Sequence, residues 1–336
     1  MRIKHLFLTV LLPVALMIQS CGPEDVVNPV TPPSGTQQED DDDDSGTTTP
    51  SGESVSMIVC TFNIRYANTA DVFPDGSSAA WSVRRDAVKK FVDTVKPDII
   101  GMQEVRKAQA QDFASFFSTD YGYYDVGRDS ASGSSITSAN CEGVGILYRK
   151  DRFEPTLKDF FWLDTQPRIL PVKNEDGTYG DWMSACRRIT VYMVLKDKKN
   201  NDALIYFFPS HYDHKSTVAR KNASQLNIDQ IKNIAKVTDI KDGNKIIFHV
   251  GDLNTTYDSG QLNVLNDNMH YARMEAGGND KYTGTFNGFG KSDSQIDHIY
   301  YGGKAVKALK YWVDKTNYGV PYISDHYPVL FQWEYQ

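Results

Sequence analysis

The chain has 336 residues, of which 40% are hydrophobic and 12% aromatic, so it is long and apolar enough to bury a sizeable core. Its formal net charge of −7 is unevenly spread: residues 1–54 carry 2 of the 36 Lys and Arg residues and 9 of the 43 Asp and Glu residues. The rest of the chain is therefore close to neutral, which argues against a long polyanion as an obligatory partner but leaves room for a local basic patch.

The N-terminus has the pattern of a segment that is removed during export. Arg2 and Lys4 precede an apolar stretch, residues 6–18, which is too short to span a bilayer comfortably. Cys21 follows this stretch, and the arrangement resembles the lipobox of bacterial lipoproteins. We therefore expect residues 1–20 to be a lipoprotein signal peptide and lipid on Cys21 to anchor the protein to a membrane. An ordinary signal peptide with a chance cysteine is the alternative.

The next segment, residues 21–54, is rich in Pro, Ser, Thr and acidic residues and includes the aspartate run 40–44. Because this composition cannot bury a core, we expect a disordered tether. One folded domain, residues 55–336, would then be held outside the cytoplasm of a Gram-negative bacterium. Its place would be the outer membrane, the cell surface or the periplasm.

Cysteine is sparse for an exported chain. Cys60 lies inside an apolar run and is expected to be buried as a small hydrophobic residue. Cys141 and Cys186 could pair outside the cytoplasm, and the sequence leaves this open. Three cysteines make no disulfide framework, and their spacing suggests no zinc site.

From residue 55 onward, runs with strand-like and helix-like spacing alternate. So many strands with few helices favour two sheets packed face to face with helices outside. Residues 164–184 contain several Pro and Gly residues and are predicted to be a long surface loop that overhangs a site. The predicted strands are 55–64, 98–102, 143–148, 156–163, 189–195, 203–209, 245–250, 295–300, 306–313 and 327–333, and the predicted helices are 81–95, 107–117, 217–238 and a short one near 259–265.

Polar side chains gather at the ends of these predicted strands. The apolar run 246–250 is followed by Asp252 and Asn254, which point the same way in an extended backbone. Alone, this pattern is more typical of a turn with Asx hydrogen bonds. Six such stretches with carboxylate, imidazole or amide groups are hard to explain as turns, because all suit metal and phosphate. The other five contribute Asn63, Glu104, His211, Asp297, and Asp325 with His326.

Taken in order, these stretches resemble the endonuclease/exonuclease/phosphatase superfamily, which has the deoxyribonuclease I-like fold. The resemblance is clearest in the segments 63–65, 103–106 and 324–329, and it extends over residues 57–334. It implies an α/β (α+β) four-layer sandwich, with two mixed β-sheets packed face to face and flanked by helices. The site would lie at the shared edge of both sheets. The segments 161–163, 181–189 and 285–289 are similar to a branch of secreted bacterial hydrolases.

The resemblance also implies a metal site for Mg²⁺ or Mn²⁺. Glu104 is the leading ligand, and Asp325 is a second ligand to metal or substrate. Asn63 would hold a metal-bound water or a phosphate oxygen. Asp252 would orient the attacking water, and Asn254 would grip the phosphate.

Two histidines would act on the same phosphate. His326 would contact the scissile phosphate or assist proton transfer, with Asp297 as the carboxylate that fixes its tautomer. His211 is the second histidine, and Glu142 is expected to pair with it. Both imidazoles should then stay protonated to higher pH than a free one. Arg188 matches a family arginine that reaches the phosphate.

The sequence thus predicts a monomeric, divalent-metal-dependent hydrolase of phosphate esters, either a phosphodiesterase or a phosphatase. A DNA or RNA nuclease would need a positive groove, and an inositol-phosphate or nucleotide phosphatase would need a basic pocket. A sphingomyelinase-like phospholipid phosphodiesterase would need exposed aromatic loops, to which Trp162, Tyr179 and Trp182 are suited. The non-enzymatic alternative is a ligand-binding surface lipoprotein.

Overall fold

A computed structural model of the protein describes residues 56–130, 133, 135–278 and 280–336. The predicted signal peptide, the lipid-bearing Cys21 and the tether lie outside these ranges. Within them, no helix is both long enough and apolar enough to cross a membrane.

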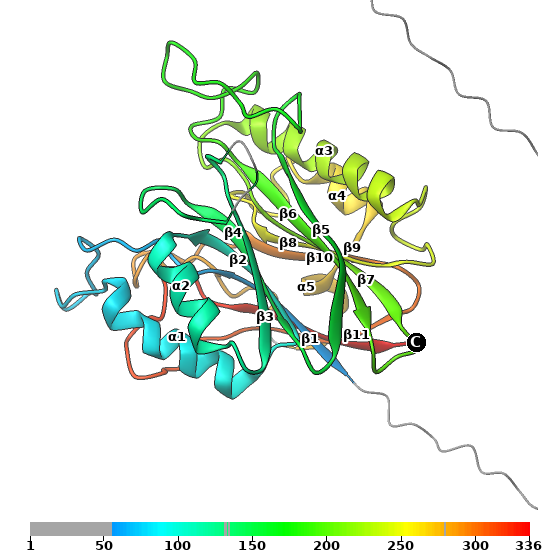
Figure 1. Cartoon of the computed structure of the whole chain (residues 1–336), viewed down its shortest axis with the longest axis horizontal. Coiled ribbons are helices and arrows are strands. Elements are labelled where there is room, and N and C mark those ends of the chain that lie inside the picture. The colour runs from blue at the N-terminus through cyan, green and yellow to red at the C-terminus, as the bar shows by residue number, and fades with distance from the viewer. Residues whose placement is uncertain (1–55, 131–132, 134, 279) are drawn as a thin grey trace, which may run out of the picture. The chain divides into compact units, whose positions relative to one another are not determined.

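The described residues form two six-stranded mixed sheets (Figure 1). The first sheet has the order β11-β12-β1-β2-β4-β3, and the second has the order β5-β6-β7-β8-β10-β9. Within them β1 pairs in parallel with β2 and β7 with β8, whereas the other pairs are antiparallel. The strands are β1 (Met57–Asn63), β2 (Ile99–Val105), β3 (Tyr121–Gly127), β4 (Gly143–Arg149), β5 (Phe153–Trp162), β6 (Ile189–Asp197), β7 (Ala203–His211), β8 (Ile246–Asp252), β9 (His270–Tyr271), β10 (Asp297–Gly302), β11 (Val306–Val313) and β12 (Val329–Tyr335).

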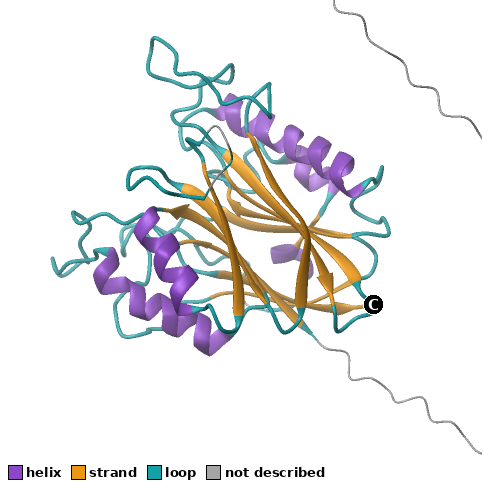
Figure 2. Cartoon of the chain, in the orientation of Figure 1, coloured by secondary structure: helices purple, strands orange, loops and turns teal. Residues whose placement is uncertain are grey.

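Helices cover the outer faces of the two sheets (Figure 2). Helices α1 (Trp81–Val95) and α2 (Lys107–Phe116) pack on the first sheet through residues such as Phe91 and Phe113. Helices α3 (Thr217–Ala235) and α4 (Asn263–Asn268) pack on the second, with Ile231 and Leu265 in the contact. The short α5 (Ala272–Glu275) contacts β10 and β11.

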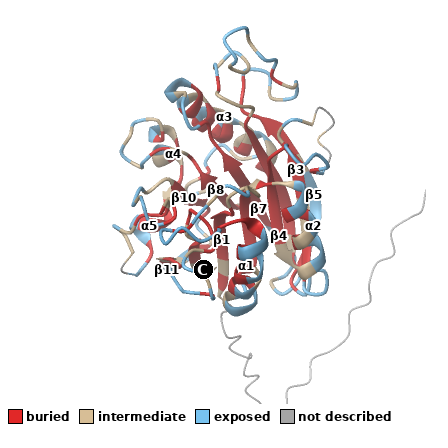
Figure 3. Ribbon diagram, turned by 90° about the vertical axis from the view of Figure 1, so that its left-hand side faces the viewer, coloured by how far each residue is buried: buried red, intermediate tan, exposed pale blue. Residues whose placement is uncertain are grey.

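The main core lies between the sheets. Along β1, Val59 faces the opposite sheet while Cys60 faces the helices, as the alternation of strand side chains requires. Phe248 and Trp333, from different sheets, pack together with ring centroids 5.3 Å apart. Burial is concentrated in the strands, and the exposed surface belongs mostly to loops and the outer sides of helices (Figure 3). This arrangement confirms the predicted four-layer sandwich.

The predicted strands and helices are all present, with ends shifted by a few residues. Strand β3 was not predicted, because its sequence YGYYDVG contains two glycines and an aspartate and shows no clear apolar alternation. The two-residue β9 and four-residue α5 are too short to give a periodic signal. Strands β10 and β12 begin two residues later than predicted, at Asp297 and Val329.

Candidate active site

Three of the predicted site residues lie side by side on the second sheet. His211 ends β7, Asp252 ends β8 and Asp297 begins β10. Asp252 is in register with His211 on one side and with Asp297 on the other. Because residues in register point to the same face, the sheet itself assembles an imidazole and two carboxylates in a row.

Asn63 links this row to the first sheet. Its amide nitrogen donates to Asp252 Oδ2 at 3.0 Å and to Glu104 Oε1 at 3.1 Å. Its Oδ1 accepts the backbone N–H of Arg65 at 3.0 Å. The Asn63 nitrogen rather than its oxygen faces the carboxylates here, so direct metal binding by Asn63 stays a prediction. In the structure Asn63 positions Glu104 and Asp252.

The backbone is unusual where the strands end. The pairing of β2 with β4 shifts between Met102 and Val105, and Glu104 lies in this bulge with φ of 62°. Arg65 and Asn254 also have left-handed backbones, with φ of 53° and 51°. Such conformations cost roughly 1–3 kcal/mol each and persist where the surrounding structure enforces them. Here they turn side chains out of the sheets toward one another.

Carboxylates on one side of the site fit a divalent cation. Ligand atoms of Glu104, His211 and Asp252 all lie within 4.8 Å of one another. Asp325 lines the same cavity, and its Oδ2 is 3.6 Å from Arg65 Nη1. Hard carboxylate oxygens of this kind are the ligands that Mg²⁺ and Mn²⁺ prefer.

Glu104 is held ready for a cation by its neighbours. Its Oε2 accepts the backbone N–H of Tyr66 at 3.1 Å. Burial acts to raise the pKa of the Glu104 carboxyl, but the charges of His326 and Arg65 and the hydrogen bond from Asn63 lower that pKa overall. Glu104 is therefore ionised at neutral pH.

The structure brings His326 and Asp297 together. His326 Nδ1 lies 2.8 Å from Asp297 Oδ2, and its Nε2 lies 3.8 Å from Asp252 Oδ2. Burial alone would lower the pKa of His326, but the charge and hydrogen bond of Asp297, with Asp252 and Asp325, raise it to about 10. His326 therefore carries a proton at neutral pH, and its free nitrogen faces the cavity.

The expected pairing of Glu142 with His211 is wrong. Glu142 forms an ion pair with Arg128 Nη1 at 2.8 Å and accepts a hydrogen bond from Arg106 Nη2 at 3.3 Å, and among the described residues no hydrogen bond joins it to His211. His211 Nε2 instead lies 3.5 Å from Asp252 Oδ2. Burial, with the charges of Arg188 and Arg128, lowers the pKa of His211 well below its ordinary value. This imidazole is neutral, contrary to expectation, and can accept a hydrogen bond.

Asn254 lies beside Asp252 in the lining of the same cavity. Its backbone N–H donates to Asp252 Oδ1 at 3.0 Å, which fixes the orientation of that carboxylate. Its side-chain nitrogen donates to the carbonyl of Tyr212 at 3.0 Å. Its side chain also lines the cavity, where it can meet a bound phosphate.

Arginines form the other side of the site. Arg188 has only 5% of its surface exposed, and its Nη2 lies 2.9 Å from His214 Nδ1. Arg128 lies beside it in the lining of the cavity. Sequence reasoning missed Arg128, which directly follows β3, the strand that was not predicted. It also missed Arg65, although Arg65 stands two residues after Asn63 in a recognised motif.

These groups enclose a cavity of about 440 Å³. Glu104, Asp252 and Asp325 line it beside Arg65, while Arg128 and Arg188 form an arginine wall together with Glu142 and His211. The described lining residues are Arg65, Tyr66, Glu104, Arg128, Glu142, Cys186, Arg188, His211, His214, Asp252, Asn254, Phe286, Ile296, Asp325 and His326.

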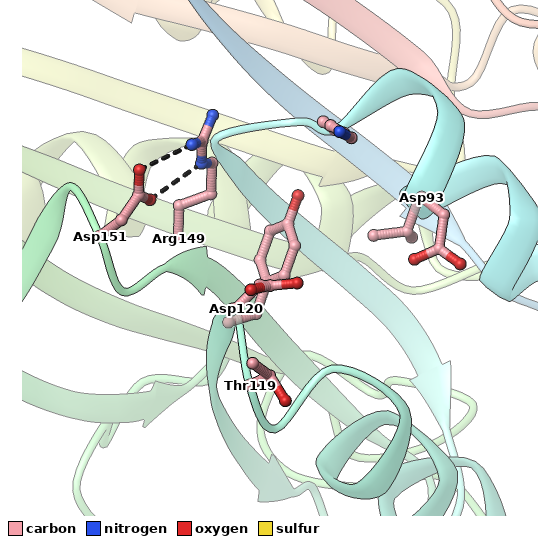
Figure 4. Close-up of a pocket in the computed structure, with 8 residues that line it drawn as sticks. Asp93, Thr119, Asp120, Arg149 and Asp151 are labelled. Carbon is pink, nitrogen blue, oxygen red and sulfur yellow. Dashed lines mark hydrogen bonds and ion pairs between the residues drawn. The ribbon is translucent and has the colours of Figure 1, made fainter.

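A larger hollow of about 590 Å³ lies at the opposite ends of β2 and β4 (Figure 4). Its lining includes Asp93, Asp120, Arg149 and Asp151. The guanidinium of Arg149 is already bound to the Asp151 carboxylate at 2.7 and 3.0 Å. The close-up shows Asp93 and Asp120 apart from this pair, so no set of groups converges on a ligand there.

The predicted aromatic loop is not present as an exposed array. Trp162 is only 2% exposed, because it belongs to β5 and packs in the core. Tyr179 is covered by the guanidinium of Arg187, 4.6 Å from the ring centroid, and Trp182 is partly buried. Among the described residues of 164–184, none lines the cavity.

The cysteine pairing left open by the sequence is also resolved. Within the described part of the chain, Cys60, Cys141 and Cys186 are all free, so Cys141 and Cys186 form no disulfide. Cys60 is fully buried, as predicted. Cys186 lines the cavity.

Comparison with known sequences identifies the class of protein. The sequence model of the Endonuclease/Exonuclease/phosphatase family matches residues 60–326, most of the folded part. The chain belongs to this family, whose members hydrolyse phosphoesters. The predicted superfamily is therefore confirmed.

The individual relatives described next share 24–28% sequence identity with this chain. A structure of an endonuclease/exonuclease/phosphatase from Bacteroides vulgatus is 28% identical, with 84% of this chain and 100% of that chain covered and a TM-score of 0.68. A mannosyl-6-phosphatase from Bacteroides thetaiotaomicron is 25% identical, with 82% and 99% covered and a TM-score of 0.70. An uncharacterized protein of Acanthamoeba polyphaga mimivirus is 24% identical over 76% of this chain and 92% of its own length.

Proposed function

We propose that this protein is a divalent-metal-dependent hydrolase of phosphate esters. The observation that carries the proposal is the meeting of both sheets at Asp252. The end of β8 is joined there to Asn63 of β1 and lies beside His211 and His326, with Glu104 next to Asn63. A binding protein would not need a buried proton donor, a neutral imidazole and two carboxylates within one cavity.

The metal would be held by Glu104 and Asp325, with Asp252 near enough to contribute. When bound, the ion would offset the negative charge on the phosphoryl oxygens. Asn63 keeps Glu104 and Asp252 at a fixed separation through its two hydrogen bonds. Both sheets would thus contribute to the metal site.

Asp252 and the groups around it would carry out proton transfer. Burial, reinforced by the Asp297 carboxylate, raises the pKa of Asp252 to about 7, so this carboxylate can orient a water and take its proton. The neutral His211, 3.5 Å from Asp252, can accept a hydrogen bond from the same water and so help to orient it. His326, protonated through Asp297, can donate a hydrogen bond to a phosphoryl oxygen or a proton to the leaving group.

The substrate class has support from one relative. A mannosyl-6-phosphatase shares the fold over almost its whole length at 25% identity, which favours phosphorylated sugars as the first substrates to test. Nucleic acids and phospholipids remain in the test because the family includes several activities. The buried position of Trp162 removes one reason to favour phospholipids.

The test is a hydrolysis screen of sugar phosphates, other phosphomonoesters, nucleic acids and phospholipids. Each substrate is incubated with the full chain in Mg²⁺, in Mn²⁺ and in EDTA. We expect at least one phosphate ester to be hydrolysed with either metal and none in EDTA. Hydrolysis that is equally fast in EDTA would contradict metal dependence, and no hydrolysis of any ester would contradict the proposal.

We also propose a membrane anchor through lipid on Cys21. The support is the apolar stretch that precedes this cysteine and the acidic segment that follows it. Cys21→Ser should release the protein to the soluble fraction or leave it unprocessed. Fractionation and gel migration identical to those of the wild type would show that the lipoprotein interpretation is wrong.

A further inference from the structure

The arginine wall of the cavity holds N–H groups that the protein does not use. Nε and Nη1 of Arg188 and Nε of Arg128 are buried and have no hydrogen-bond partner among the residues that the structure describes. Leaving a buried charged donor unpaired is unfavourable. Such donors are expected where a ligand supplies the missing acceptor.

The positive charge of this wall is only partly compensated. Glu142 is shared between Arg128 and Arg106. Asp213 Oδ2 lies 3.8 Å from Arg188 Nε, but its carboxylate already accepts backbone N–H groups at the start of α3 and in the segment before β6. An anionic ligand would therefore find both charge and donors here, and guanidinium forks match phosphate oxygens.

A second, much smaller recess lies against these arginines. This recess, lined by Arg128, Glu142, Val144, Arg188 and His211 among others, measures only about 10 Å³. That volume is about the least that admits one water-sized group. One oxygen atom fits in this recess, whereas an alcohol substituent of a phosphate does not fit in it.

We propose that Arg128 and Arg188 make this site select phosphomonoesters over phosphodiesters, an inference that rests on the proposed function. A terminal phosphate carries a charge of about −1.5 to −2 and three oxygens that accept hydrogen bonds. A diester carries one charge, and its second substituent would have to lie either against the arginines or in place of a metal-side oxygen. A monoester therefore offers the unpaired donors one more acceptor oxygen and more negative charge than a diester does.

The test compares kcat/KM for 4-nitrophenyl phosphate and bis(4-nitrophenyl) phosphate in Mg²⁺. The wild type should prefer the monoester. Arg128→Met should lower kcat/KM for the monoester about 100-fold, the size of a lost charged hydrogen bond, and change that for the diester less than about 3-fold. The matched control is Arg187→Met, since Arg187 is bound to Asp129 and to the carbonyl of Pro171 and does not line the cavity. Arg187→Met should leave unchanged the ratio of kcat/KM for the monoester to kcat/KM for the diester.

Inhibition by inorganic phosphate gives a second readout. Arg128→Met should weaken it at least about 10-fold, whereas Arg187→Met should not, and thermal unfolding reports whether each variant folds. If Arg128→Met does not fold, Arg128→Lys is used in its place, because lysine keeps a positive charge for Glu142 but lacks the guanidinium N–H groups. It should shift the ratio in the same direction.

The outcomes separate the two proposals. A wild type that hydrolyses neither ester, nor any other substrate with either metal, contradicts the proposed function itself. A wild type that prefers the diester contradicts this inference alone. Equal losses on both esters in the Arg128 variants would also overturn it, because the arginine would then serve any phosphate.

Discussion

At the scale of single residues, the metal assignment depends on Glu104. Its carboxylate is aimed by a β-bulge and held by Asn63 and the backbone of Tyr66. Glu104→Gln keeps the shape but removes the charge, so Mg²⁺ affinity and turnover should fall at least about 100-fold. Calorimetric titration with Mg²⁺ and turnover at limiting Mg²⁺ measure both, with the exposed Glu175→Gln as control. Near-normal turnover of Glu104→Gln would show that another residue binds the metal.

The His326–Asp297 pair makes a separate prediction at the same scale. Asp297→Asn preserves size but loses the charge that favours the imidazolium, so the pKa of His326 should fall from about 10. Turnover should drop, and His326→Ala should reduce it by roughly 100-fold to 10,000-fold. NMR titration of the imidazole reports the pKa directly. An unchanged pKa in folded Asp297→Asn would mean that Asp297 does not control His326.

At the scale of elements, the spacing between the sheets fixes the site. A Cβ added at Gly101 of β2 would lie 2.6 Å from Pro209 Cβ and 3.0 Å from Val250 Cγ2, both in the second sheet. Gly101→Ala should therefore lower the free energy of unfolding by about 1–3 kcal/mol and reduce turnover, since Asn63 would move relative to Asp252. Gly145→Ala is the control, because its nearest neighbour is a flexible methionine end at 3.3 Å. Chemical denaturation measures both variants, and equal stability would contradict this packing account.

Most strands and part of the site could be predicted from the sequence, whereas features that depend on strand register could not. Strong apolar alternation predicted most strands to within a few residues, and the motif order placed Asp252, Asp297 and His326 correctly at one edge. The β-bulge at Glu104 was not foreseen, because it depends on the register with β4. The pairing of Glu142 with arginines was missed for a similar reason: Arg106 and Arg128 are brought together only by the fold.

At the scale of the whole molecule, stability should depend on pH through buried histidines. Burial lowers the pKa of His249 and of His298 to about 4, and both rings are fully hydrogen-bonded as neutral groups. In the unfolded chain these two imidazoles have the ordinary pKa of about 6.5, so they bind protons there at a pH where the folded rings stay neutral. The stability that the neutral rings contribute is therefore complete above pH 6.5 and is lost as the pH falls toward 4. Each of the two histidines should lower the free energy of unfolding by about 2–3 kcal/mol when the pH falls from 7 to 4.5.

Chemical unfolding at the two pH values measures this loss. His249→Gln should lower stability at pH 7 but show a smaller decrease on acidification than the wild type, by about 2–3 kcal/mol. His326 does not affect the comparison, because it contributes equally to the wild type and to His249→Gln at each pH. Equal acid losses in the wild type and in His249→Gln would contradict the assignment of His249 as a buried neutral ring.

The central claim is that two sheets meet at Asp252 to build one metal-dependent phosphoester site. The most direct test is hydrolysis of a sugar phosphate by metal-free protein to which Mg²⁺ is restored, in the wild type and in Asp252→Asn. The account predicts that activity in the wild type returns with Mg²⁺, while folded Asp252→Asn stays at least about 100-fold lower at every Mg²⁺ concentration. Wild-type activity that needs no metal, or full activity in Asp252→Asn, would contradict it.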